Sequence, residues 1–215
     1  GNAATRVDLK LDLPGNRVQW SDMPPLENLK GKIRITESNP EFDNISADFL
    51  GGNLKIASAP STGAGQNYTV SGDISAGFIK NYYVNTLKKE SHAALDALSG
   101  SVKYDGLMSF GKFGSETNLK FDLRDLASTA PPPAQKPKGT PLLGVVTIKT
   151  LAKPKAGSTS LSWNGKFGDL YTTQGELNSE GELRYGLGVG APANLPQQGL
   201  SLNLVSNELN VDSWV

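Results

Sequence analysis

Histidine is the side chain that enzymes use most often as an acid or base near neutral pH, and this chain has a single one, His92. It lies between Ser91 and Ala93 in a segment of helix-forming residues, where a histidine is far more often a solvent-facing helix residue than a catalytic base. The composition leaves a Ser-His-Asp arrangement open, but the Gly-x-Ser-x-Gly motif that presents a serine nucleophile is absent. We therefore expect a protein that is not an enzyme.

Glycines and carboxylates are the other residues whose spacing could bind a cofactor or a metal ion. Gly186, Gly188 and Gly190 resemble a phosphate loop, but their spacing differs from a dinucleotide motif and Pro192 stands where a helix would begin. A bulge or a tight bend in a strand is the favoured interpretation. The carboxylates lack the spacing of a calcium loop, and a metal site would need histidines that the chain does not have. We expect neither a cofactor nor a metal ion. The carboxylates considered are Asp43, Asp48, Glu176, Glu180 and Glu182.

The charge balance and the composition exclude some classes of binding partner and some kinds of site. The 21 lysines and arginines balance 21 aspartates and glutamates, so no long-range field favours nucleic acid, and we expect none as a partner. Cysteine is absent, which excludes disulfides and cysteine-rich zinc sites. The sequence shows no run of about 18 apolar residues and no signal peptide. Residues 1–4 are interpreted as a cloning remnant, and the remainder as a fragment of a longer protein.

The hydrophobic pattern predicts strands. Val7, Leu9, Leu11 and Leu13 alternate with charged residues, the period of two that places all apolar side chains on one face of a strand. Residues 14–16 are expected to turn the chain. Similar alternation recurs up to the C-terminus between scattered glycines and prolines, so the fold class is predicted to be all-β.

Two segments interrupt the strands. Residues 75–98 carry apolar residues at helical spacings and predict one or two short helices. Residues 127–142 contain five prolines and predict a linker or surface loop. The expected organisation is a first β module over residues 5–126, this linker, and a second β module over residues 143–215 that continues the same sheet.

A sheet with one apolar face must cover that face, because each exposed large aliphatic side chain forgoes roughly 1.5 to 3 kcal/mol of burial. A second sheet, the helical segment or an apolar ligand such as a lipid chain could each supply the cover. Periodicity alone favours an ordinary sandwich core, since the pattern shows burial and not what causes it.

Several segments, in order along the chain, resemble the YhdP-type proteins of the AsmA-like superfamily. Residues 23–31 (MPPLENLKG) resemble the start of a strand in that family, and residues 47–54 (ADFLGGNL) its Leu-Gly-Gly hairpin, with Asn53 where proline is usual. Residues 74–100 resemble its short helices ending in Leu-Ser-Gly. Residues 123–142, with Asp125 where glycine is common, are similar to its proline-rich passage, and residues 198–214 to its ending in Asp-x-Trp.

This resemblance implies an elongated, curled antiparallel sheet, open like a groove or a loose sandwich, with one or two short helices. It implies a periplasmic segment of a protein anchored in the inner membrane of a Gram-negative bacterium, with phospholipid as its partner. The segment would shield and conduct acyl chains between the inner and outer membranes and so support the outer-membrane permeability barrier.

Under this interpretation the alternating residues line a hydrophobic groove. The alternative is a structural or protein-interaction β module of the cell envelope without a lipid path, which would have a filled core and an exposed edge strand or apolar patch. The predicted groove residues are Val7, Leu9, Leu11, Ile33, Ile35, Leu54, Ile56, Val70, Val102, Leu119 and Phe121.

Overall fold

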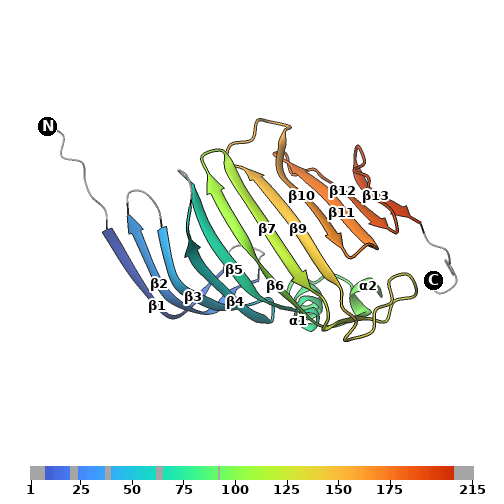
Figure 1. The fold of residues 1–215 in the computed structure, drawn as a ribbon, viewed down its shortest axis with the longest axis horizontal. Helices are drawn as coiled ribbons and strands as arrows, with labels where there is room; N and C mark the ends of the chain where they lie inside the picture. The colour runs from blue at the N-terminus through green and yellow to red at the C-terminus, as the bar shows by residue number, and fades with distance from the viewer. Residues whose placement is uncertain (1–7, 20–23, 37–39, 62–64, 92, 206–215) are drawn as a thin grey trace.

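The strands of the chain form one sheet and lie side by side almost in sequence order (Figure 1). The computed structural model describes residues 8–19, 24–36, 40–61, 65–91 and 93–205. The sheet has 13 strands, of which β8 pairs with β6 outside the main order. The strands are β1 (Asp8–Val18), β2 (Leu26–Thr36), β3 (Pro40–Phe49), β4 (Gly52–Ala59), β5 (Gln66–Ser75), β6 (Leu98–Gly111), β7 (Gly114–Asp122), β8 (Leu126–Ser128), β9 (Leu143–Leu151), β10 (Thr159–Phe167), β11 (Tyr171–Asn178), β12 (Leu183–Val189) and β13 (Gly199–Leu204).

The all-β prediction and the open, curled sheet are confirmed. The sheet does not close, because β1 pairs only with β2 and β13 only with β12 among the described residues. All neighbouring pairs are antiparallel except β12 and β13, which run parallel. The first eight strands and the last five belong to one sheet, since β7 pairs with β9 along its whole length across the proline-rich segment.

Strand register separates the side chains into an apolar face and a polar face, because residues directly opposite each other in a ladder point to the same side. Leu11 lies opposite Ile33, Ile56 opposite Val70, and Leu119 opposite Val146. The polar face carries cross-strand ion pairs such as Arg34 with Asp8, at 2.9 Å between Nε and Oδ1. Larger apolar side chains on the polar face include Leu107, Leu143, Val145 and Leu151.

The turn predicted at residues 14–16 is wrong. Residues 14–16 do not turn the chain but form an irregularity inside β1, where the register with β2 shifts. A proline is tolerated there because β1 is an edge strand and its missing amide interrupts no central ladder. Of the three glycines for which a bulge or a tight bend was expected, Gly186 and Gly188 lie in regular register with β11, and Gly190 forms a bend directly after β12 with a φ of 66°.

Short helices connect β5 to β6 as predicted: α1 (Ala76–Asn81), a π-helical turn η1 (Tyr82–Thr86) and α2 (Ala93–Asp96). Ser75 caps α1 by accepting a hydrogen bond from the amide of Phe78 at 3.2 Å. The helices lie beside β6 at the ends of the strands, between the outer strands β1 and β13 (Figure 1). No helix in the described ranges is long and apolar enough to cross a membrane.

Candidate binding surface

The apolar face runs without interruption from β1 to β13. Its side chains follow one another across every ladder of the main strand order, directly or past a bulge, so that each strand except β8 contributes two or more of them. No second sheet formed by the described residues packs on this face. Its large members include Leu9, Leu11, Ile33, Ile35, Phe42, Ile45, Leu54, Ile56, Tyr68, Val70, Val102, Tyr104, Leu119, Phe121, Val146, Ile148, Trp163, Phe167, Tyr171, Leu177, Leu183, Leu187, Leu200, Leu202 and Leu204.

The predicted groove residues that the structure describes all lie on this face. Val7, the first of them, lies outside the described residues, as does His92. The others form two rows, one from β1 across to β5 and one on β6 and β7. Whether any of them contacts lipid stays a prediction. The two rows are Leu9, Leu11, Ile33, Ile35, Leu54, Ile56 and Val70, and then Val102, Leu119 and Phe121.

Exposure varies along the apolar face. Leu54 and Val70, near the centre of the first half, are 7% and 8% exposed and pack among their neighbours. Towards the ends the face opens, with Leu9 47% and Leu202 59% exposed. No side chain in the described part of the chain is fully buried. The apolar face, called the trough below, is therefore closely packed near β3 to β5 and exposed to solvent towards β1 and β13.

Aromatic rings gather at two places on the apolar face. Near the β6–β7 hairpin, the Tyr68 ring lies 4.8 Å from that of Phe42 and 5.7 Å from that of Phe110, measured between centroids. The Tyr68 hydroxyl donates a hydrogen bond to the carbonyl of Pro40 at 2.8 Å, and burial raises the pKa of this phenol above its ordinary value. Tyr68, at the centre of this cluster, is 4% exposed, whereas Phe110 at its edge stays 43% exposed.

The second aromatic group forms a row at the helix end of the sheet. The centroid of Phe121 lies 6.3 Å from that of Tyr104 and 6.0 Å from that of Phe167. Tyr171 continues the row opposite Phe167, and its hydroxyl donates to the carbonyl of Pro133 at 2.8 Å. Burial raises the pKa of Tyr104 and of Tyr171, with the nearby carboxylate of Asp73 adding to the effect at Tyr104. The proline-rich segment thus contacts this rim of the apolar face.

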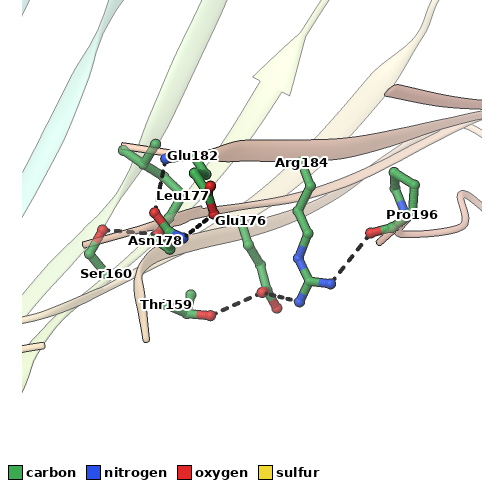
Figure 2. Close-up of polar contacts among 8 residues, drawn as sticks. All are labelled: Thr159, Ser160, Glu176, Leu177, Asn178, Glu182, Arg184 and Pro196. Carbon is green, nitrogen blue, oxygen red and sulfur yellow. Dashed lines mark hydrogen bonds and ion pairs between the residues drawn. The ribbon is translucent and has the colours of Figure 1, made fainter. Parts of the chain in front are cut away.

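A polar cluster lies on the opposite face, where residues 190–198 cross the sheet between β12 and β13 (Figure 2). Arg184 donates through Nη2 to Oε2 of Glu176 at 2.7 Å and through Nη1 to the carbonyl of Pro196 at 3.4 Å. Thr159 donates to the same Glu176 oxygen at 3.0 Å. The hydrogen bond from Arg184 lowers the pKa of Glu176 against the opposing effect of burial.

This cluster borders a depression of about 490 Å³. Arg184 and Glu176 are paired with each other, and Arg184 also contacts the crossing segment, so these two residues help to hold that segment against the sheet. Within the described ranges no three histidine, aspartate or glutamate side chains gather closely enough to bind a metal ion. That the protein is not an enzyme remains an expectation.

Sequence reasoning missed the second half of the apolar face. Residues on β9 to β13 such as Val146, Ile148, Trp163, Phe167 and Leu202 continue the surface, although none was among the predicted groove residues. The signal was present as alternation in β10 and β13. In β9 it was hidden because Val145 and Val146 are adjacent, and only the pairing of Val146 with Leu119 shows which of them faces the trough.

The fold defines an all-β protein built as a single open sheet with one apolar and one polar face. A family model described as YhdP protein matches residues 1–215, and the chain therefore belongs to the YhdP family. Comparisons with curated proteins and with solved structures gave no significant match to this chain.

Proposed function

We propose that this chain is a periplasmic segment of an inner-membrane-anchored envelope protein of Gram-negative bacteria that shields and conducts phospholipid acyl chains between the two membranes. In this role it supports the permeability barrier of the outer membrane. Membership of the YhdP family supports the proposal. The observation that carries it is the apolar face itself, which continues across every strand from β1 to β13 and is left half exposed at both ends.

Covering the exposed leucines of the apolar face would lower the free energy of a complex with lipid. Leu9, Leu200 and Leu202 keep 47%, 58% and 59% of their surface accessible, so covering the remainder would stabilise each by about 0.7 to 1.8 kcal/mol. Acyl chains provide such a cover and need no hydrogen bonds from the sheet, whose ladders already satisfy the backbone. A shallow open surface holds them weakly at any one point, which suits passage along the sheet.

The alternative function is a structural or protein-interaction module of the envelope with no lipid path. It is favoured by the packed cluster of Phe42, Tyr68 and Phe110, which fills part of the trough, and by the two outer strands, whose far edges have no partner among the described residues. Unpaired edges can accept a strand from another protein.

Native mass spectrometry of the purified chain, with lipid extraction from the same sample, tests the proposal. We expect bound phospholipid, and we expect Leu202→Asp to reduce it strongly because the carboxylate would lie in the acyl path. Ser201→Asp is the matched control, since it adds the same charge one residue away on the polar face. An unrelated β protein purified in parallel controls for carry-over of membrane lipid.

The outcomes separate the two functions. Bound phospholipid that is lost in Leu202→Asp and kept in Ser201→Asp supports a lipid path. Lipid-free protein after exposure to phospholipid, with a folded sheet by circular dichroism, contradicts the proposal and favours the structural module. Equal lipid loss in both variants would also count against a path along the apolar face.

A further inference from the structure

Two glycines in the second half of the sheet lie beneath aromatic rings. Gly175 of β11 is directly opposite Trp163 of β10, and Gly144 of β9 is directly opposite Phe167 of the same strand β10. A Cβ atom built on Gly175 would overlap Cζ2 and Cη2 of the indole, and one built on Gly144 would overlap Cδ1 and Cε1 of the phenyl ring. Both rings therefore lie flat across the neighbouring strand instead of standing up from the sheet.

From this geometry we infer that Gly144 and Gly175 set the depth of the trough. A ring that lies over a glycine adds apolar surface to the floor and leaves the space above it free for a ligand. A ring lifted by a methyl group would occupy that space. The inference rests on the proposed function, because it assigns these two positions to the accommodation of acyl chains.

Contacts with neighbouring side chains hold both rings in these positions. Trp163 donates through Nε1 to the hydroxyl of Thr173 at 3.3 Å, which holds the indole down over Gly175. Phe167 contacts Phe121, with centroids 6.0 Å apart, and so belongs to the aromatic row at the helix end. Lifting either ring would break one of these contacts and place the ring where an acyl chain would otherwise lie.

Other glycines of the apolar face have a different role. At Gly72 and Gly106 a Cβ atom would overlap backbone carbonyl oxygens, those of Asn53 and Asn118, so these positions are required by the backbone itself. At Gly144 and Gly175 the three nearest atoms all belong to a ring that can move. Gly165 lies between them on β10, and a methyl group there would meet only Cγ2 of Thr173 at 3.0 Å and of Val146 at 3.1 Å as its nearest atoms.

The test compares Gly144→Ala and Gly175→Ala with Gly165→Ala as a matched control on the same face. The three chains and the parent carry Trp20→Phe and Trp214→Phe, so that Trp163 is the sole tryptophan and can be excited selectively over the tyrosines. Each is titrated in dilute detergent with a phosphatidylcholine brominated on its acyl chains, and quenching of Trp163 is recorded. We expect roughly tenfold weaker binding for Gly144→Ala and Gly175→Ala, as for the loss of contact with about two methylene groups, and parent-like binding for Gly165→Ala.

Further measurements keep the inference falsifiable. Circular dichroism and thermal melting show whether each variant retains the sheet. Adding Trp163→Leu to Gly175→Ala removes the overlapping ring and is expected to restore phospholipid binding, measured by native mass spectrometry. If both glycine variants are folded and bind like Gly165→Ala, or if the double variant does not recover, the inference is wrong while the proposed function stands. Absence of quenching in the parent chain would contradict the proposed function and the inference with it.

Discussion

Arg184 and Lys136 are two cations whose side chains hold loop carbonyls against the sheet. Arg184 contacts the carbonyl of Pro196 in the segment that crosses between β12 and β13. Lys136, which is 9% exposed, donates to the carbonyl of Leu126 at 2.7 Å and to two further carbonyls in the proline-rich region. Both interactions help to hold irregular segments in place, and at Lys136 the ammonium acts beside a backbone bridge with Ser128 of β8.

The pair formed by Arg184 and Glu176 predicts a pH dependence of stability. The pKa of Glu176 is lowered in the folded state, so its contribution is complete above the unfolded value near 4.5 and is lost as pH falls through the lower folded value. We expect Glu176→Gln to reduce the free energy of unfolding by about 0.5 to 1 kcal/mol at pH 7, a range that allows for solvent screening of the partly exposed pair. Thermal melts of both chains between pH 7 and pH 3 measure this difference.

The same melts distinguish the pair from a general loss of charge. Glu180→Gln removes an exposed carboxylate from the neighbouring turn and is expected to leave stability unchanged at all pH values. A difference between the parent and Glu176→Gln that stays constant down to pH 3 would show that the ion pair does not stabilise the fold.

We expect replacement of Lys136 to change the stability of the fold more than replacement of Glu176. Lys136→Met keeps most of the volume of the side chain but removes the donor that lies 2.7 Å from the carbonyl of Leu126, and we expect a loss of about 1 to 3 kcal/mol in the free energy of unfolding. Urea denaturation measures it, with the exposed Lys138→Met as control. Equal stability of the two variants would mean that apolar packing and not the ammonium group anchors the proline-rich segment.

At the scale of elements, the parallel pair β12 and β13 depends on close contact between a strand and the segment that crosses it. Thr172 donates to the carbonyl of Ala191 at 3.0 Å, and Gln174 donates to that of Ala193 at 2.7 Å. Gly186 and Gly188 lie under this segment and have no side chain to hold it away. The crossing returns the chain so that β13 can add Leu200 and Leu202 to the apolar face.

We predict that Gly188→Ala loosens β13. A Cβ atom there would overlap the carbonyl oxygen of Ala191 and Oγ1 of Thr172, so the crossing segment must move. Hydrogen exchange of the β13 amides is expected to become faster while exchange in β9 and β10 is unchanged. Gly111→Ala is the control, because its Cβ would have nothing closer than 3.9 Å. Unchanged exchange in β13 would show that the crossing is not what holds this strand.

The sequence predicted the elements better than their connections. Alternation placed Leu9, Leu11, Ile33 and Ile35 on one face, and the period of two survives in the structure because each strand is paired on a regular ladder. The segment 14–16 was misjudged because proline, glycine and asparagine are typical of turns and also of irregular edge strands. Local composition does not distinguish these cases, since strand pairing decides between them.

The candidate surface was predictable only in part for the same reason. Leu54 and Val70, two of the predicted groove residues, lie on the apolar face but are only 7% and 8% exposed, and a single sequence does not specify how closely the neighbouring side chains pack around them. Gly144 and Gly175 carried no sequence signal of their role, because the rings above them come from another strand. Such cross-strand relations depend on register, which a single sequence leaves open.

The whole molecule is an open sheet that separates an apolar side from a polar side along its entire length. Its charges balance, 21 against 21, and many of them lie on the polar face, where ion pairs such as that of Lys149 with Glu116 link neighbouring strands. A sheet of this kind without a second layer exposes apolar surface in proportion to its length. A ligand or partner is therefore expected to cover the apolar face and to leave the polar face in water.

Photo-crosslinking at adjacent positions on opposite faces tests this claim most directly. A photoreactive amino acid is placed at Leu9, Leu119 or Leu202 on the apolar face, and at the neighbouring Lys10, Lys120 or Ser201 on the polar face, in chains incubated with phospholipid. The account predicts phospholipid adducts by mass spectrometry at all three apolar positions and at none of the polar ones. Adducts of equal yield on both faces, or none at all in a folded chain, would contradict it.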